Sequence, residues 1–169
     1  MYRFVSPRRV AVAMAVVAVL GFAGPVAADG PKRFKGQYEG DVTITPLAPP
    51  FVKVDIDGSG KASHLGKFTV EIPHIVNRAN RTAVGSYQFT TRNGDTLTAD
   101  FTGQSTPIAG TAILYIVETA TITGGTGRFA GATGSFVAER LFDTIALTTA
   151  GSFKGTIRLG DDDNDEDDD

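Results

Sequence analysis

Short runs in which apolar and polar residues alternate recur along most of the chain. In residues 36–45, for example, Tyr38, Val42 and Ile44 alternate with acidic residues and threonines. A period of two places successive side chains on opposite faces, so this pattern predicts strands with one buried face. Comparable runs follow at about 51–57, 65–76, 82–90, 96–102, 111–122, 134–142 and 147–159. The sequence therefore predicts about eight strands and no amphipathic helix.

Turn residues separate these runs. Asn93-Gly94 between two alternating runs predicts that residues 82–90 and 96–102 form an antiparallel hairpin. Pro73 predicts an edge, a bulge or a bend late in the third strand, because proline cannot donate to a ladder. Residues 111–122 are apolar on both faces, which predicts the most enclosed strand. A sandwich or a small barrel fits this spacing, and we favour a single antiparallel eight-stranded β-barrel, since closure removes exposed edges.

The beginning of the chain has the pattern of a signal peptide. Three arginines at positions 3, 8 and 9 precede an apolar run over residues 11–23, and small residues follow up to Ala28. The run is shorter than the roughly 18–20 residues that a transmembrane helix requires. We therefore expect cleavage after residue 28, a secreted or periplasmic protein, and no membrane span after cleavage. The barrel is then expected over residues 29–160.

Charge and cysteine content narrow the choice of class. The chain has no cysteine, so no disulfide stabilises the exported domain. Residues 29–160 carry 13 basic and 11 acidic residues, which gives no concentrated basic face and argues against nucleic-acid binding. Residues 161–169 form an acidic tail with eight of the 19 acidic residues. Such a tail is expected to be disordered and solubilising, or to bind divalent cations or a basic partner loosely.

A glycine-rich connection, Gly124-Gly-Thr-Gly-Arg-Phe-Ala-Gly-Ala-Thr-Gly134, joins two of the predicted strands. Its predicted turn residues are Gly124, Gly125, Gly127, Phe129, Gly131 and Gly134. This connection resembles the hairpin shared by plant dirigent proteins and the allene oxide cyclase barrel. With the segments 63–68 and 93–97, it is also similar to secreted bacterial proteins of unknown function placed beside that group. The resemblance implies a calycin-like barrel and, from the plant proteins, a homotrimer; it transfers no catalytic residue.

Two charged residues lie within apolar faces of neighbouring strands. Glu118 shares its face with Leu114 and Ile116, and Arg140 shares its face with Phe136. If both faces point inward, the two charges lie together inside the barrel, where they must be paired. They then form a structural ion pair or a polar anchor for a small molecule. Outward-facing charges are the third possibility.

Other residues complete the candidate binding set. Tyr115 or Tyr87 is an alternative lining residue, and Glu71 is a second candidate acid. His64 is expected either to cap the turn that opens the third strand or to lie at a barrel mouth. His64 and His74 would be roughly 33 Å apart along a continuous strand, so we expect no shared metal. Residues 55–60 resemble the start of a calcium loop but fit a turn better.

The sequence contains no motif that identifies a reaction or a cofactor. The favoured hypothesis is non-enzymatic binding of a small hydrophobic molecule or a surface partner. The alternative is a cyclase or isomerase, resembling allene oxide cyclase, that acts on a small hydrophobic intermediate with Glu118 or Glu71 as its carboxylate. Eleven phenylalanines could fill the bore, whereas small residues at 85, 99, 103, 138 and 155 could hollow it. The sequence leaves that question open.

Overall fold

A computed structural model describes residues 30–160 of this protein. The predicted signal peptide, residues 1–28, and the predicted acidic tail, residues 161–169, therefore lie outside the described residues. The strands are β1 (Lys32–Pro46), β2 (Phe51–Ala62), β3 (Gly66–Glu71), β4 (His74–Asn77), β5 (Thr82–Thr91), β6 (Thr96–Pro107), β7 (Ile113–Gly125), β8 (Thr133–Asp143) and β9 (Thr148–Arg158). One short 3-10 helix, η1 (Gly127–Phe129), lies between β7 and β8.

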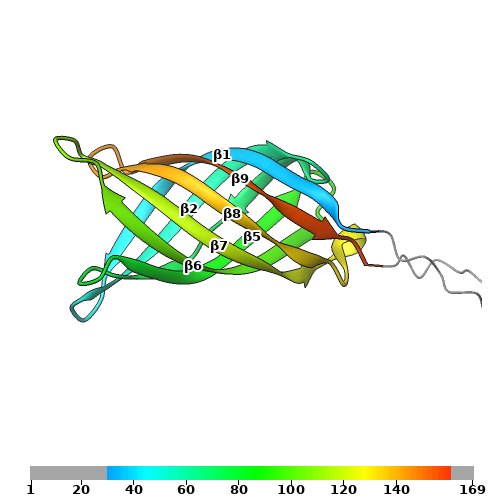
Figure 1. Cartoon of the computed structure of the whole chain (residues 1–169), viewed down its shortest axis with the longest axis horizontal. Coiled ribbons are helices and arrows are strands. Elements are labelled where there is room, and N and C mark those ends of the chain that lie inside the picture. Colours follow the sequence, from blue (N-terminus) through cyan, green and yellow to red (C-terminus); the bar gives the residue numbers. More distant parts are fainter. Residues whose placement is uncertain (1–29, 161–169) are drawn as a thin grey trace, which may run out of the picture.

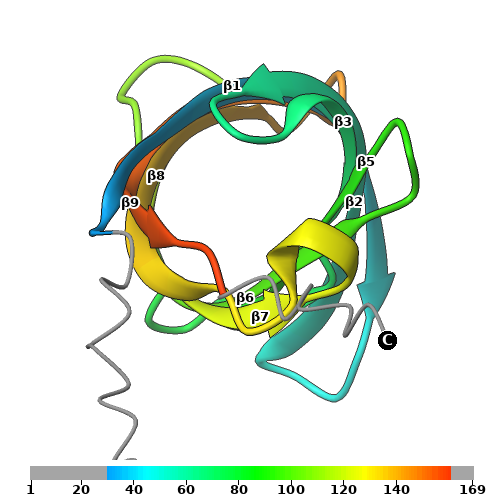
Figure 2. The same cartoon turned by 90° about the vertical axis from the view of Figure 1, so that its right-hand side faces the viewer.

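The strands close into a barrel. Neighbouring strands pair antiparallel from β1 through β9, β8, β7, β6 and β5, and β1 also pairs with β2. Both β3 and β4 bridge β2 to β5, so they occupy one position in the ring as two halves of one strand. The predicted closed eight-stranded antiparallel barrel is confirmed, and Figure 2 looks along its axis from the end that carries η1.

The break between β3 and β4 falls where the proline predicted a bend. Ile72 still donates its backbone N–H to Ile56 O at 2.9 Å, but Pro73 has no N–H to continue the ladder. Pro73 O instead accepts from Ser86 N at 3.2 Å. The chain re-enters the sheet at His74, which pairs with Gly85. The predicted third strand is therefore two short strands at one place in the barrel.

The predicted hairpin between β5 and β6 is present. Thr91 N donates to Asp95 O at 2.9 Å, and Gly94 adopts a φ of 89° that favours glycine. The prediction that β7 is the most enclosed strand is wrong. Its side chains alternate, with Ile116 buried inside the barrel and Tyr115 exposed outside. A single-layered barrel has only one buried face, so the outward apolar residues of β7 remain accessible to solvent.

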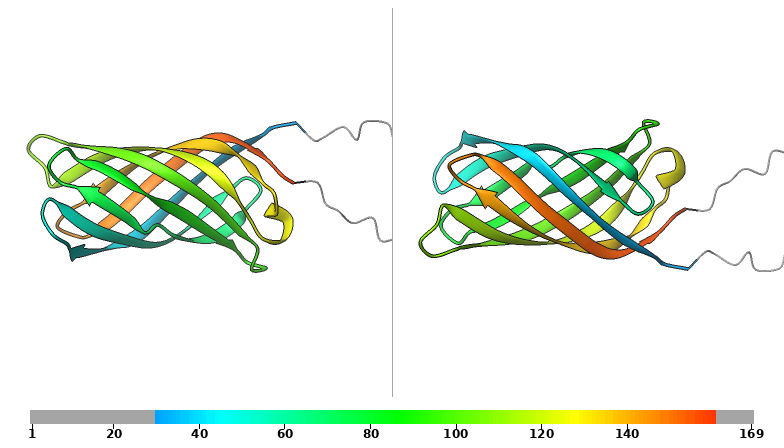
Figure 3. Two further views of the ribbon diagram at one scale, coloured as in Figure 1. Left: turned by 90° about the horizontal axis from the view of Figure 1, so that it is seen from below. Right: turned by 90° about the horizontal axis from the view of Figure 1, so that it is seen from above.

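The two ends of the barrel differ. The turns 63–65 and 92–95 lie at one end with η1, and the first and last described strands also begin and end there (Figure 3). We call this the closed end. The turns at the other end, which we call the open end, are 47–50, 78–81, 108–112 and 144–147, and two of them project beyond the strands at the left of Figure 1.

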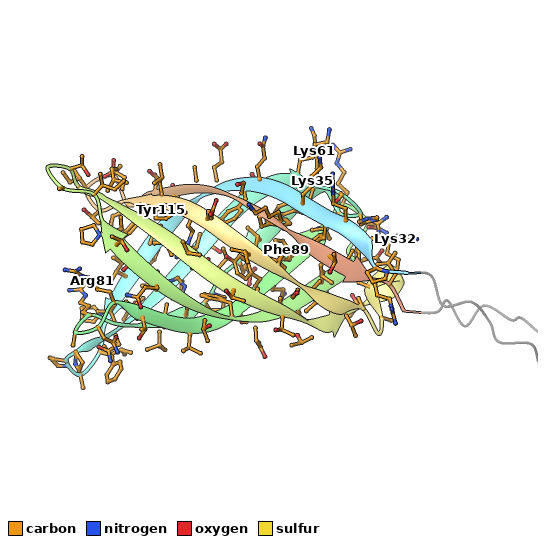
Figure 4. All side chains as sticks on the ribbon, viewed as in Figure 1. Lys32, Lys35, Lys61, Arg81, Phe89 and Tyr115 are labelled. Atoms are coloured by element: carbon orange, nitrogen blue, oxygen red, sulfur yellow. The ribbon has the colours of Figure 1, made fainter. Side chains whose placement is uncertain are left out.

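Aromatic rings fill the bore towards the closed end. Phe34 and Phe153 have ring centroids 4.9 Å apart, Phe68 and Phe89 are 5.2 Å apart, and Phe136 and Phe153 are 5.2 Å apart. Phe129 of η1 is fully buried beside them. We call these six phenylalanines the aromatic plug, and Figure 4 shows Phe89 within the barrel. These buried rings fill this half of the bore, and their tilted and edge-on arrangements are the favourable ones for aromatic pairs.

The small inward residues near the middle of the barrel do not leave it hollow. Gly103 lies opposite Glu118, and a methyl group on Gly103 would come within 2.9 Å of Glu118 Cγ. Gly151 lies opposite Arg140, and a methyl group there would come within 2.5 Å of Arg140 Cβ. Each glycine thus provides the space that a large neighbour on the next strand occupies.

Candidate ligand-binding site

A cavity of about 370 Å³ occupies the open end of the barrel. Its size lies within the usual range for pockets that hold small organic molecules. Its walls come from β1, β2, β4, β5, β6, β7 and β8, so every position in the ring except β9 contributes. The residues that line it are Val42, Ile44, Val52, Val54, His74, Val76, Arg78, Arg81, Ala83, Gln104, Ser105, Leu114, Ile116, Arg140, Phe142 and Thr144. The closed half of the bore is therefore filled by side chains, whereas the open half is hollow.

The lining is mainly aliphatic, with polar groups both at the mouth of the cavity and at its inner end. Arg78 and Arg81 belong to the open-end turn 78–81, and Figure 4 shows Arg81 at that end of the barrel. His74 and Arg140 are buried and lie further in. The pocket can therefore accept an apolar body and offers hydrogen-bond donors at its inner level and its mouth.

Glu118 and Arg140 form a buried ion pair, as the alternation of β7 and β8 predicts when both faces point inward. Arg140 Nη2 donates to Glu118 Oε1 at 2.9 Å, and Arg140 Nε donates to the same oxygen at 3.2 Å. Arg140 Nη1 lies 3.4 Å from Thr149 Oγ1, which donates in turn to Leu141 O at 2.8 Å. The guanidinium is thus held by a carboxylate and by a side chain of β9.

Two tyrosines complete this buried network. Tyr87 donates its hydroxyl to Glu118 Oε2, and the hydroxyls of Tyr38 and Tyr87 lie 3.4 Å apart. Both carboxylate oxygens of Glu118 are therefore occupied. Within the described residues, no buried side-chain nitrogen or oxygen lacks a hydrogen-bond partner. The network is satisfied internally, which is the condition for burying charges in a barrel core.

The surroundings fix the protonation states of the network. Burial, reinforced by the Glu118 carboxylate, raises the pKa of Tyr38 to about 12. Burial also raises the pKa of Tyr87 well above its ordinary value. Burial alone would lower the pKa of Arg140, but the neighbouring Glu118 carboxylate more than offsets this and raises it. At neutral pH both tyrosines are neutral donors and Arg140 is charged.

His74 lies beside this network and faces the same interior. Its Nδ1 is 2.9 Å from Ile72 O, and because a carbonyl oxygen only accepts, Nδ1 carries the proton of the neutral ring. The ring packs edge-on against Phe101, with centroids 5.7 Å apart. Burial lowers the pKa of His74 below its ordinary value, and the nearby Arg140 adds to this effect. His74 is therefore neutral at pH 7.

His74 predicts a specific loss of stability in mild acid. The unfolded chain takes up a proton at the ordinary histidine pKa, about 6.5, before the folded chain does, so unfolding becomes easier as the pH falls below that value. The nearby carboxylates of Glu118 and Asp55 oppose the shift without reversing it. We expect His74→Asn, which keeps an N–H near the position of Nδ1, to flatten this part of the pH profile. The check is urea unfolding of both proteins between about pH 7.5 and about pH 5. Equal slopes would show that another group causes the change.

The structure brings together only part of the candidate set predicted from sequence. Glu118, Arg140 and Tyr87 meet in the core, whereas Tyr115 lies on the outer face of β7, away from them. His64 lies in the closed-end turn 63–65 with a φ of 64°, and its Nε2 is 3.2 Å from Arg33 O. This placement agrees with a role in the turn and puts His64 at the opposite end from the pocket.

Glu71 also lies outside the barrel. It faces an open groove of about 980 Å³ across the outer wall, where Asp57 lies opposite it and Asp41 lies opposite Asp57. This groove is larger than the cavity at the open end but shallow and exposed. Enclosure rather than size favours a ligand site, so we take the smaller cavity as the candidate.

Sequence reasoning missed Tyr38 and Thr149 and considered His74 only as a metal ligand. The sequence could have indicated that His74 is buried, because it shares a face with Val70 and Ile72 across the predicted bend. In residues 30–160, no group of three or more His, Cys, Asp or Glu residues is arranged to hold a metal ion. In the glycine-rich connection, Gly124, Gly127, Gly131 and Gly134 all have positive φ, as turn residues require.

The comparisons with known proteins concern the fold. The solved structure of the pterocarpan synthase dirigent protein GePTS1 is similar to this chain, with a TM-score of 0.52 and 16% sequence identity. The similarity covers 88% of this chain and 98% of that one. A comparison with protein-family models finds no match, and a comparison with curated proteins finds none at the sequence level. The chain therefore has a dirigent-like closed β-barrel fold with an open-ended apolar pocket. Among its described residues, no helix has the length and apolar character needed to cross a membrane.

Proposed function

We propose that this protein is exported and binds one small, mainly apolar molecule in the open-end cavity without changing it chemically. The observation that carries this proposal is the contrast between the two halves of the bore. The aromatic plug fills the closed half, whereas the open half retains about 370 Å³ between aliphatic walls. Export follows from the signal-peptide pattern of residues 1–28, and the homotrimer implied by the dirigent resemblance remains part of the proposal.

The arrangement of the ion pair supports binding over catalysis. Glu118 does not line the cavity, and neither Asp nor Glu occurs among the described residues that do. Both of its oxygens are bound, one by Arg140 and the other by Tyr87. A cyclase or isomerase that used this carboxylate would first have to break these contacts in a buried site. GePTS1 is called a synthase, but at 16% identity the likeness carries the fold alone.

The inner level of the pocket also suggests what part of a ligand it would recognise. Arg140 is held firmly by Glu118, but its contact with Thr149 is long at 3.4 Å. A carbonyl or hydroxyl oxygen on the ligand can accept a hydrogen bond from this side of the guanidinium. The ligand class is therefore an apolar molecule with one polar oxygen directed inward, which matches how apolar pockets fix orientation.

Filling the cavity with a new side chain tests the proposal. Ala83 lines the cavity, and the next residue, Val84, points to the outside of the same strand. We expect Ala83→Phe to weaken binding of the neutral fluorescent probe N-phenyl-1-naphthylamine by at least about tenfold, because the ring occupies the volume that the probe needs. Val84→Phe adds the same ring on the outer face and is the matched control, so its affinity should be unchanged.

Three results would count against the pocket. One is equal probe binding by the wild type and Ala83→Phe, which would place the probe elsewhere. A second is equal weakening in both phenylalanine variants, which would indicate a general effect on the barrel. The third is the absence of any saturable binding by the wild type. Circular dichroism of each variant separates loss of the site from loss of the fold.

A further inference from the structure

Nine large apolar side chains of the described residues are exposed, and the largest group of them lies at the open end of the barrel. Five of them lie on the open-end turns or directly beside one, and Ile145 is the most accessible, with 82% of its surface exposed. We call this group the apolar crown; its members are Leu47, Phe51, Ile108, Ile145 and Leu147. The crown surrounds the mouth of the cavity, since the turns that carry it also border the pocket lining.

The composition of the turns differs between the two ends. The four open-end turns contain no Asp or Glu, and their charged residues are Arg78 and Arg81. The closed-end turns contain Arg92, Asp95 and Arg128, and none of the exposed large apolar residues of the described chain lies on them. The open-end turns are therefore apolar and cationic, whereas the closed-end turns are polar and of mixed charge; the basic residues of the strand ends at the closed end, such as Lys32, Lys35 and Lys61, lie among no exposed large apolar side chains.

We infer that the open end is a docking surface for a lipid bilayer that contains anionic headgroups. In this arrangement the apolar crown enters the interface between headgroups and acyl chains, while Arg78 and Arg81 pair with lipid phosphates. Guanidinium groups match phosphate geometry well, and exposed apolar side chains combined with basic residues are the usual features of interfacial binding. The inference rests on this surface and does not depend on the pocket holding a ligand.

A bilayer fits the crown better than a protein partner does. The apolar residues belong to separate turns spaced around a ring, with the opening of the cavity between them. A protein interface requires a continuous core that excludes water, whereas a fluid interface can accommodate separate side chains independently. Docking in this way would also place the mouth of the cavity against the apolar layer.

The acidic residues near the open end determine how the barrel is expected to stand on the bilayer. Asp143 is the last residue of β8, and its carboxylate accepts from the backbone N–H groups of Ile145 and Ala146, both at 2.9 Å, so it is engaged within the turn. The outer wall carries Asp41, Asp57 and other carboxylates along the groove described above. An anionic surface would repel this wall. The barrel is therefore expected to stand end-on to the bilayer.

Sedimentation with vesicles tests the inference. The protein used is residues 29–169, because the apolar run at 11–23 would itself bind lipid, and every strand of the barrel lies within this range. We expect it to sediment with vesicles of phosphatidylcholine and phosphatidylglycerol. Leu47→Ser with Ile145→Ser should lower the partition coefficient by about tenfold, since two exposed apolar side chains can no longer enter the bilayer interface. Circular dichroism confirms that each variant is folded.

The matched control removes apolar surface from the wall instead of the end. Val84→Ser with Leu141→Ser changes side chains that are 63% and 49% exposed, comparable to Ile145 and Leu47 at 82% and 44%. This control should retain wild-type partitioning. Equal loss in both double variants would overturn the inference, as would an absence of sedimentation with these vesicles. A dimer that forms in solution through the crown, seen by light scattering and lost in the crown variant, would also overturn it.

The arginines predict a separate lipid dependence. Arg78→Gln with Arg81→Asn should remove most of the preference for phosphatidylglycerol over pure phosphatidylcholine; asparagine suits the φ of 60° at position 81. Lys61→Gln with Lys67→Gln removes two charges at the closed end, where these residues lie opposite each other, and should keep the preference. If the lysine variant lost the preference and the arginine variant kept it, the closed end would be the one that faces the lipid and the inference would be wrong.

Discussion

Glu118→Ala is expected to lower the free energy of unfolding by about 3–5 kcal/mol, the cost of leaving a buried charge without its partner. Arg140 would lose its two hydrogen bonds to Oε1, and Tyr87 would lose its acceptor. For a domain of this size the loss corresponds to a fall in Tm of roughly 10–20 °C. Urea and thermal unfolding at pH 7 measure both quantities.

A double substitution distinguishes the cost of an unpaired buried charge from the contribution of the ion pair itself. In Glu118→Met with Arg140→Met both charges are absent, so much of the stability lost in Glu118→Ala should return, because apolar replacements of a buried pair are often neutral. Glu139→Ala alters the adjacent, outward-facing residue of β8 and should change stability by less than about 0.5 kcal/mol. A cost below about 1 kcal/mol for Glu118→Ala would mean that water or an anion reaches Arg140 and replaces the lost carboxylate.

Phe89→Ala is expected to cost about 3–5 kcal/mol, the range for removing a large aromatic ring from a packed core. Phe89 is fully buried, and its ring contacts those of four other members of the aromatic plug as well as Tyr87, on which it stacks with centroids 5.5 Å apart. The strands hold the surrounding rings in place, so they can collapse into the vacated space only in part. Chemical denaturation measures the loss.

Phe51→Ala is the matched control for this prediction. It removes the same ring from the apolar crown, where the side chain is exposed, and should cost less than about 1 kcal/mol. The Phe89→Ala cavity would be dry and lined by aromatic rings, so it should bind a small apolar solute such as benzene and regain stability. Similar costs for the two substitutions would show that the closed half of the bore is not tightly packed.

Alternation along the chain predicted the strands and favoured a barrel over a sandwich, and it gave a buried ion pair as one of three possibilities for Glu118 and Arg140. Glu118 and Arg140 each lie in a run whose apolar residues share one face, and burial of those faces brings the two charges together. Pro73 and Asn93-Gly94 marked the bend and the hairpin because each residue restricts the backbone in a known way. These features depend on local periodicity and turn chemistry, which a single sequence contains.

The pocket could not be predicted in the same way. Whether a small residue leaves space depends on which residue lies opposite it, and this register is set by the closure of the whole ring. Gly103 and Gly155 looked like sources of a hollow, but Glu118 and Phe136 occupy the space beside them. Tyr115 looked like an inward residue because β7 is apolar on both faces, yet a single-layered barrel leaves one of them exposed.

The two buried halves of the bore have different roles in this account. The aromatic plug stabilises the closed end, and the network of Glu118, Arg140 and Tyr87 separates it from the cavity. A satisfied polar layer at this depth gives the cavity a rigid inner level with directed donors. The same layer engages both oxygens of the Glu118 carboxylate, which supports the proposal of binding rather than catalysis.

Native mass spectrometry of the protein purified from its own source without refolding tests the central claim most directly. The account predicts one small apolar molecule for each chain, retained by Val84→Phe and absent from Ala83→Phe. The same spectra report the number of chains in the assembly. A folded wild-type chain that carries no ligand and takes up none from a mixture of small apolar compounds would contradict the account.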